Sequence, residues 1–279
     1  MKGKYLSSVA GIALTSILGA GGSAQAQAPN WAGSYFGVNA GWAWGRSHAV
    51  TTSDCSGSPS AFDWYYCDSA TPDNGLAVDA SGTGWMSGDT FIAGVQAGHN
   101  WQIDKFVYGL EADFGSFHLK GSRQASGPYV VDYNIVSASF DSYTIGTGFQ
   151  TDWLFTMRGR LGWTTDRLLR EHDRLLIYAT GGMALTNLKT SFTFSDTEGA
   201  AASGSASGRR AGWALGAGLE YMLNERWSVK GEYLHVDFGD VCTSGTITSQ
   251  IFGVGYSQGI GTCADLTADL ARIGINYRL

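Results

Sequence analysis

Proline, charge and long apolar runs are all scarce in this sequence of 279 residues. It contains only 4 prolines, and Lys, Arg, Asp and Glu together make up 15% of the chain. Beyond residue 26 no apolar stretch reaches the roughly 20 residues that a membrane-spanning helix needs. If the mature chain lies in a membrane, it must therefore be a β-barrel, because only helices and closed barrels satisfy every backbone polar group in lipid.

Basic clusters and metal-binding motifs are also missing. The net charge is −6 and no run of Lys or Arg follows the pattern that tracks phosphates, so nucleic acid is not expected as a partner. Acidic residues gather between Gly45 and Gly84 against the single Arg46, and no EF-hand spacing occurs among them, so a solvated loop is favoured over a cation site. No metal or other cofactor is expected. These acidic residues are Asp54, Asp63, Asp68, Asp73 and Asp79.

Glycine and aromatic residues are abundant instead. The chain has 40 Gly, 10 Trp, 13 Tyr and 13 Phe. Aromatic residues favour strands, and glycine occurs where turns or close backbone contacts are needed. This composition indicates an all-β protein.

The first residues have the features of a secretory signal peptide. Lys2 and Lys4 precede the apolar run Tyr5 to Leu18, and small residues lead to an A-x-A site at Ala24–Ala26. We expect residues 1–26 to be removed and residues 27–279 to form one outer-membrane β-barrel domain.

Four cysteines lie in two pairs, each within one Gly/Ser-rich segment. They are Cys55 with Cys67 and Cys242 with Cys263. An exported protein matures in an oxidising compartment, so disulfides are the default. Three connectivities are allowed, and pairing within each segment is favoured because the partners are close in sequence. A metal site is the weaker alternative, since neither pair has C-x₂-C spacing.

Eight segments alternate apolar with polar or small residues at a period of two, which is typical of strands with one buried face. They span residues 35–44, 90–101, 106–114, 153–163, 175–185, 213–221, 227–233 and 272–279. In the seventh the alternation changes phase between Leu234 and Asp237, which predicts a bulge.

The predicted connections alternate in length. Short ones join the second strand to the third, the fourth to the fifth and the sixth to the seventh. The long ones are about Gly45 to Gly88, Lys120 to Gly146, Thr190 to Arg209, and Gly239 to Leu266. Transmembrane barrels have short periplasmic turns and longer extracellular loops. Trp and Tyr near the strand ends fit interfacial girdles, which favours this fold over a soluble lipocalin-like barrel with its apolar face inward.

The polar faces of these strands carry balanced charge. If they point inward, four acidic and four basic side chains meet in one narrow barrel: Glu111, Asp113, Glu220 and Glu232 with Arg158, Arg160, Lys230 and Arg272. Buried charges persist only when they are paired and hydrogen-bonded. We expect an ion-paired core that closes the lumen, rather than a conducting path, because eight strands leave room only for side chains.

Four motifs resemble a known family. They are WAGSYFGVNAG at 31–41, GVQAGHNW at 94–101, WSVKGEYLHVDFG at 227–239 and RIGINYRL at 272–279. Together they are similar to the small outer-membrane surface proteins of alphaproteobacteria, which include outer-membrane immunogenic proteins and porin-family barrels. The resemblance covers essentially the whole mature chain.

The resemblance implies an eight-stranded antiparallel up-and-down barrel that the barrel assembly machinery inserts by reading the last strand. The corresponding insertion signal here is Ile273, Ile275, Tyr277 and Leu279. This chain departs from the family by ending in Leu279, where Phe is commoner, and by its long first loop with two cysteines.

The sequence therefore predicts a non-catalytic surface protein of the cell outer membrane, with structural or antigenic loops. Outer-membrane lipid and lipopolysaccharide are its expected surroundings, and self-association stays open. Two alternatives are a narrow porin-like channel for small solutes and a haem-binding surface protein that uses His118 or His235. A lipid-modifying enzyme is the least favoured, because the five histidines are isolated from one another in sequence and serines are abundant, so any Ser/His pairing would be arbitrary.

Overall fold

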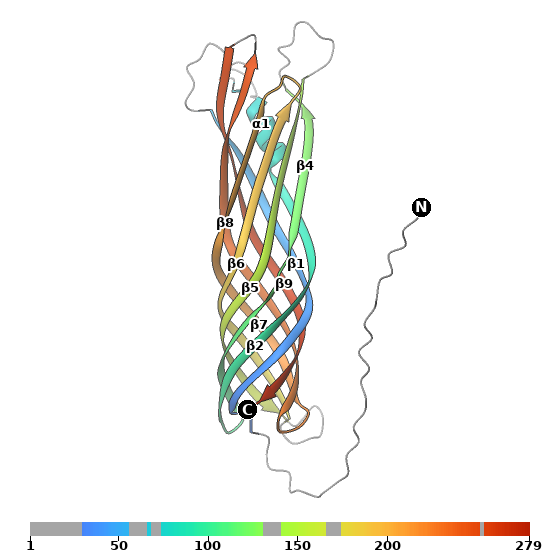
Figure 1. Cartoon of the computed structure of the whole chain (residues 1–279), viewed down its shortest axis with the longest axis vertical. Coiled ribbons are helices and arrows are strands. Elements are labelled where there is room, and N and C mark those ends of the chain that lie inside the picture. Colours follow the sequence, from blue (N-terminus) through green and yellow to red (C-terminus); the bar gives the residue numbers. More distant parts are fainter. Residues whose placement is uncertain (1–29, 56–65, 68–73, 131–140, 166–173, 252–253) are drawn as a thin grey trace, which may run out of the picture.

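The chain forms one long antiparallel β-barrel (Figure 1). The structure, a computed structural model, describes residues 30–55, 66–67, 74–130, 141–165, 174–251 and 254–279, with the backbone alone at 249–251 and 254–256. The predicted signal peptide, residues 1–26, lies outside these residues. Within the described part, no helix has both the length and the apolar character to cross a membrane.

The strands run through almost the entire described chain. They are β1 (Gly33–Asp54), β2 (Gly84–Ile103), β3 (Phe106–Ser116), β4 (Lys120–Pro128), β5 (Ser142–Thr165), β6 (Leu175–Asp196), β7 (Ala201–Met222), β8 (Trp227–Ile251) and β9 (Val254–Arg278). One helix, α1 (Asn74–Gly82), lies between β1 and β2 in sequence. The sheet order β3-β2-β1-β9-β8-β7-β6-β5-β4 closes through pairing of β3 with β5. A closed ring leaves no unpaired sheet edge.

The nine labelled strands occupy eight positions around the ring. β3 pairs with the second half of β5, from Trp153 to Trp163, and β4 pairs with its first half, from Ser142 to Gln150. β3 and β4 are therefore one strand interrupted at residues 117–119. The interruption faces a register shift in β5 between Thr151 and Leu154. The predicted eight-stranded antiparallel up-and-down barrel is confirmed.

The predicted bounds of the four long loops were too wide. The seven uninterrupted strands contain 20 to 25 residues each, whereas crossing a membrane takes only about 9–11 residues of a tilted strand. Most of Thr190–Arg209 and Gly239–Leu266 is strand, and β1, β2, β4 and β5 extend into the other two predicted loops. The barrel therefore continues well beyond the segment that the apolar alternation identified.

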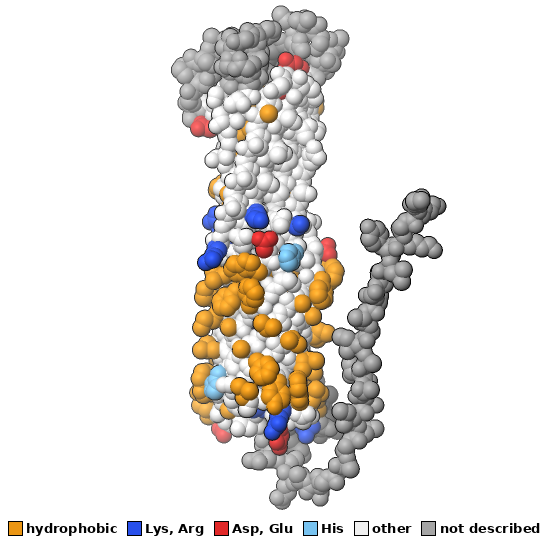
Figure 2. Space-filling model, in the orientation of Figure 1, with side chains coloured by type: hydrophobic (Ala, Val, Ile, Leu, Met, Phe, Trp, Pro, Cys, Tyr) orange, Lys and Arg blue, Asp and Glu red, His pale blue; other side chains and the backbone are white. Residues whose placement is uncertain are grey.

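The two halves of the barrel have opposite polarity. In the half that contains the short connections, apolar side chains lie on the outside, and Figure 2 shows them gathered in a band on the face that it draws. Beyond a belt of charged side chains, the outer face turns to serine, threonine and glycine, as in Ser203, Ser205 and Ser207 on β7. The inner face of this second half is apolar, with Phe149, Phe192 and other large side chains buried. We call the two halves the apolar-band half and the distal half.

This inversion corrects the predicted bulge between Leu234 and Asp237. Leu234, Val236 and Phe238 are all buried and point inward, in the same phase as Glu232 below them. The strand alternation therefore continues unbroken, and only the interior changes from charged to apolar. The real register shift of β8 against β9 lies between Asp237 and Asp240, where Gly239 has a positive φ of 63°.

The predicted solvated loop between Gly45 and Gly84 is only partly described. Asp63, Asp68 and Asp73 lie outside the described residues, Asp54 ends β1 and Asp79 lies on α1. Figure 1 shows α1 inside the distal end of the barrel, surrounded by strands. Of the predicted short connections, the one between Thr164 and Arg174 falls mostly on residues outside the described ranges.

The polarity inversion makes a testable prediction about arginine substitutions on the outer face of β7. Leu215→Arg places a charge in the lipid-facing band and should destabilise the folded barrel by roughly 2–4 kcal/mol. Ser203→Arg, on the same face of the distal half, should change the free energy of unfolding by no more than about 0.5 kcal/mol. Urea titration in phosphatidylcholine vesicles, followed by tryptophan fluorescence, measures both. Equal losses for the two variants would contradict the inversion.

Candidate functional site

The lumen of the apolar-band half contains all eight charged side chains that the sequence placed there. They project inward because they occupy alternate positions of β3, β5, β7, β8 and β9, and each is at most 6% exposed. We call this set the lumen network. Its members are Glu111, Asp113, Arg158, Arg160, Glu220, Lys230, Glu232 and Arg272.

Arg158 lies at the centre of the lumen network. Its guanidinium donates to Glu111 Oε1 and Asp113 Oδ2, each at 2.8 Å. It also donates to Glu232 Oε1 at 3.2 Å, on β8. One arginine on β5 thus joins carboxylates from β3 and β8 through the middle of the barrel.

The other three cations complete the network. Lys230 Nζ donates to Glu111 Oε1 at 2.8 Å. Arg272 lies 2.9 Å from Asp113 Oδ1 and 2.6 Å from Glu232 Oε2. Arg160 donates to Glu220 Oε2 at 2.7 Å. Every charge therefore has an opposite partner, as buried charges require.

Neutral side chains satisfy several further hydrogen-bonding groups of the network, whereas Arg160 Nε has no hydrogen-bond partner among the described residues. The Tyr35 hydroxyl donates to Glu111 Oε2 at 2.8 Å, and the Tyr178 hydroxyl donates to Glu232 Oε1 at 3.0 Å. The Arg160 guanidinium lies over the Tyr178 ring, 4.0 Å from its centroid. A Cβ at Gly98 would collide with the Tyr35 ring. Glycine at this position therefore leaves the space in the narrow lumen that the ring occupies.

The two tyrosines were missed as members of the network. The fifth predicted strand was apolar or small on both faces, so its sequence gave no reason to turn Tyr178 inward. The structure shows which face points inward, since Tyr178 and Thr180, two residues apart on β6, are both buried.

Apolar side chains close the lumen on both sides of the network. At the end with the short connections, Trp31, Val107, Leu176, Tyr178 and Met222 form one buried cluster. In the distal half, two larger clusters occupy the interior, and we call them together the distal core. Its members include Met86, Phe117, Leu119, Phe149, Leu188, Leu234, Phe238, Tyr66, Tyr143, Ile145, Phe192, Phe194, Ile247 and Ile260.

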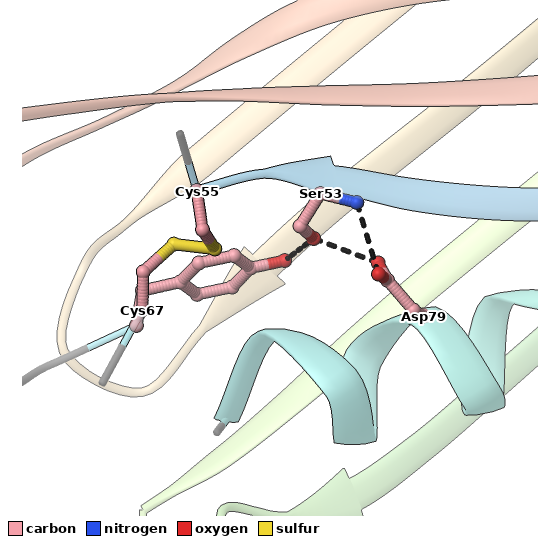
Figure 3. Close-up of a disulfide and its surroundings, with 5 residues drawn as sticks. Ser53, Cys55, Cys67 and Asp79 are labelled. Atoms are coloured by element: carbon pink, nitrogen blue, oxygen red, sulfur yellow. Dashed lines mark hydrogen bonds between the residues drawn. A yellow bond between two sulfur atoms is a disulfide. The ribbon is translucent and has the colours of Figure 1, made fainter. Parts of the chain in front are cut away.

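Helix α1 completes the distal core and is tied to the barrel wall. Figure 3 shows Asp79 of α1 accepting hydrogen bonds from the backbone N–H and the hydroxyl of Ser53, at 3.0 and 2.7 Å. Beside them, a disulfide joins Cys55 to Cys67. The Tyr143 hydroxyl of β5 donates to the carbonyl of Ala77 at 2.9 Å. The helix therefore fills the end of the barrel interior.

The cysteines pair locally, as the sequence favoured. The second disulfide joins Cys242 on β8 to Cys263 on β9, which are directly opposite each other in the register. Both of these side chains are exposed on the outer face of the distal half. The expected loop is in fact a two-stranded extension of the barrel wall, and the disulfide cross-links it.

The two histidines considered for haem do not lie together. His118 is exposed in the interruption between β3 and β4, whereas His235 lies on β8, where its Nδ1 is 2.8 Å from Asp269. Three positions of the ring separate these elements. The described residues contain no group of three or more His, Cys, Asp or Glu side chains that could hold a metal ion.

One serine–histidine contact exists near the end with the short connections. Ser34 Oγ lies 2.9 Å from His99 Nδ1. A nucleophile needs a base that a third group orients. In the part of the chain that the structure describes, the neighbour of the His99 ring is Trp101, with ring centroids 4.6 Å apart. The contact therefore lacks the orienting carboxylate of a catalytic triad.

The predicted insertion signal lies on the lipid-facing side of β9. Ile273, Ile275 and Leu279 are exposed. Tyr277 contacts the aromatic rings of Phe36 and Trp227 on the neighbouring strands. An outward apolar stripe on the last strand is what the resemblance implies, and its recognition by an assembly machine stays a prediction.

The chain is similar in sequence to known outer-membrane proteins. A family model described as outer membrane protein beta-barrel domain matches residues 12–258. A 31 kDa outer-membrane immunogenic protein of Brucella melitensis is 33% identical over 250 residues, which covers 86% of this chain and 88% of that protein. A 25 kDa outer-membrane immunogenic protein of Brucella abortus is 25% identical over 211 residues, or 76% and 67% of the two chains. Among solved structures, the outer membrane protein OprG of Pseudomonas aeruginosa aligns over 89% of this chain and 97% of its own, with 12% identity and a TM-score of 0.40.

The lumen network predicts a large effect of removing its central cation. Arg158→Met removes one cationic partner from each of three buried carboxylates, those of Glu111, Asp113 and Glu232. It should destabilise the barrel by about 3–5 kcal/mol. Adding Asp113→Asn removes one of the excess negative charges and should recover part of the loss. The exposed turn variant Arg226→Met should change stability by no more than about 0.5 kcal/mol. Urea titration of the folded protein checks all three, and an unaffected Arg158→Met barrel would refute the central role.

Proposed function

This chain belongs to the outer membrane protein beta-barrel domain family and is an outer-membrane protein, and from this premise we propose that it is a closed, non-catalytic surface barrel. In this proposal the apolar-band half anchors the protein in the membrane. The distal half carries a rigid, hydroxyl-rich surface away from the membrane, towards the environment.

The observation that carries the proposal is the filled lumen. Eight charged side chains at the level of the apolar band bind one another across the barrel. An ion that passed this level would have to break those pairs, whose partners would then lie buried without compensation. An eight-stranded ring is just wide enough for its own side chains, so no spare cross-section remains beside the network.

The distal core supports the same conclusion. Phe117, Leu119 and Phe149 are buried in the interior directly beyond the network, and α1 lies further along the same interior. A water-filled path requires polar walls, whereas these side chains pack against one another. The narrow solute channel is therefore the less favoured function.

A non-catalytic role also fits the positions of the histidines. His235 is held between Asp269 and the ring of Trp213 on the outer face, and His99 lies against Trp101. We propose that these residues serve the interface between barrel and lipid rather than chemistry.

The closed lumen predicts the outcome of planar-bilayer recording. Purified full-length mature protein should insert without stepwise conductance, because the network and the distal core block the interior. Heat-modifiable migration of the same sample on a gel verifies that the barrel is folded.

A conducting protein would contradict this proposal in a recognisable way. Lys230 lies inside the lumen and Ser203 lies on the outside of the barrel. A channel through this chain would be established by regular current steps whose size changes with Lys230→Gln but not with Ser203→Arg. Steps that neither variant alters come from another protein and leave the expected result intact.

A further inference from the structure

A groove lies on the outer wall of the barrel, beyond the apolar band. It has a volume of about 700 Å³ and runs across β4, β5, β6 and β7, and it also borders Ser87 of β2. We call it the basic groove, because Lys120 and Lys189 line it. Figure 2 shows that charged side chains form a belt at the border between the apolar band and the polar distal half.

The polar residues of the groove form ordered rows across the sheet. Lys120 pairs in register with Gln150, Gln150 with Lys189, and Lys189 with Ser207, so these four residues make one row on neighbouring strands. The next row away from the band is Ser122, Gly148, Ser191 and Ser205. The ammonium groups of Lys120 and Lys189 therefore lie on either side of the Gln150 amide. The serine hydroxyl groups of the second row lie next to them.

Gly148 creates the hollow at the centre of the second row. A Cβ built on this residue would meet its nearest neighbours, Gly121 O and Ser191 Oγ, at 3.5 and 3.6 Å, which is ordinary contact. Packing therefore does not require glycine here. The missing side chain leaves open space on the outer surface, between Ser122 and Ser191.

The charge around the groove is positive. Arg209 lies in the row next to the band, in register with Asn187, and adds a third exposed cation. The nearby carboxylates already have partners. Asp152 accepts a hydrogen bond from Asn187 at 2.7 Å, which lowers the pKa of its carboxyl, and Lys189 lies 3.9 Å from it. Asp89 accepts one from the indole of Trp42 at 3.0 Å.

The distance from the apolar band identifies the kind of ligand. Lys189 lies four residues beyond Leu185 on β6, which is ~13 Å along a strand and ~10 Å along the axis of a tilted barrel. The polar headgroup layer of an ordinary phospholipid bilayer is only about 5–8 Å deep on each side. The basic groove therefore lies beyond a phospholipid headgroup, at the level where a lipid with a larger sugar headgroup still presents polar groups.

We propose that the basic groove binds the phosphorylated saccharide headgroup of an outer-leaflet glycolipid. Lys120 and Lys189 bind the phosphate oxygens, for which an ammonium is a compact charged donor. Gln150 and the serine hydroxyls exchange hydrogen bonds with the sugar hydroxyls, and the hollow at Gly148 accommodates a sugar ring. The proposal needs only the outer-membrane location of the barrel, so its failure would leave the closed lumen untouched.

Native mass spectrometry of the detergent-solubilised full mature chain tests the proposal, with purified rough lipopolysaccharide as the probe. The wild-type barrel should bind it, and Lys120→Gln with Lys189→Gln should weaken binding at least about tenfold, since two charge-assisted contacts are lost. Gly148→Phe, which fills the hollow but keeps both lysines, should weaken binding similarly. Thr52→Phe and Arg226→Gln, both exposed and away from the groove, are the matched controls and should bind like the wild type.

Four further ligands distinguish the source of the anion. The phosphorylated saccharide released from the acyl chains should compete for the groove, and dephosphorylated lipopolysaccharide should bind more weakly. Inorganic phosphate that competes as well as the saccharide would overturn the proposal in favour of a simple anion site. Phosphatidylglycerol that binds as tightly as lipopolysaccharide, or groove variants that bind like the wild type, would also overturn it. Heat-modifiable migration verifies that each variant is folded.

Discussion

The narrow interior of an eight-stranded ring is the constraint on which the rest of this structure depends. Such a ring holds its own side chains and little else, so every residue that points inward must pack or pair with another. In the apolar-band half this produces the lumen network around Arg158, where carboxylates from β3 and β8 meet. The outside of the same strands can then be wholly apolar, because all of their charge is satisfied within.

The same constraint explains why the polarity inverts along the barrel. Outside the membrane the outer face meets water, and serine and threonine suit it. The interior then gains most from apolar side chains, which need no partners and gain stability from burial. Leu234 and Glu232 stand two residues apart on one face of β8, yet one belongs to the distal core and the other to the lumen network. The strands are about twice as long as a membrane crossing requires. One end of the barrel can thus have the lipid-facing surface of a membrane protein, while the other has the polar surface of a β-structure in water.

Sequence reasoning captured the membrane half and missed the distal half for one physical reason. Strands are recognised by apolar residues at every second position. This alternation is strong where Phe36, Val38 and Trp42 face lipid. Beyond the belt the outward residues are small and polar, so alternation such as Ser203, Ser205 and Ser207 resembled a loop. The eight lumen charges were identifiable because each lies on the polar face of its strand, opposite a face of apolar residues. The register that joins Lys120, Gln150 and Lys189 was not, because it depends on the interruption of β3 and β4.

A closed interior moves the functional surface to the outside of the barrel. The outer wall is long enough to carry separate regions, with an apolar band, a charged belt and a hydroxyl-rich distal face following one another along the same strands. The belt is where a lipid-facing barrel wall becomes a water-facing one, so it is also where a ligand can contact both lipid and sheet. Gly148 is informative in this respect, because its neighbours leave room for a side chain that the sequence does not supply. The residues of the barrel wall are therefore constrained by the outer surface as well as by the packing of the interior.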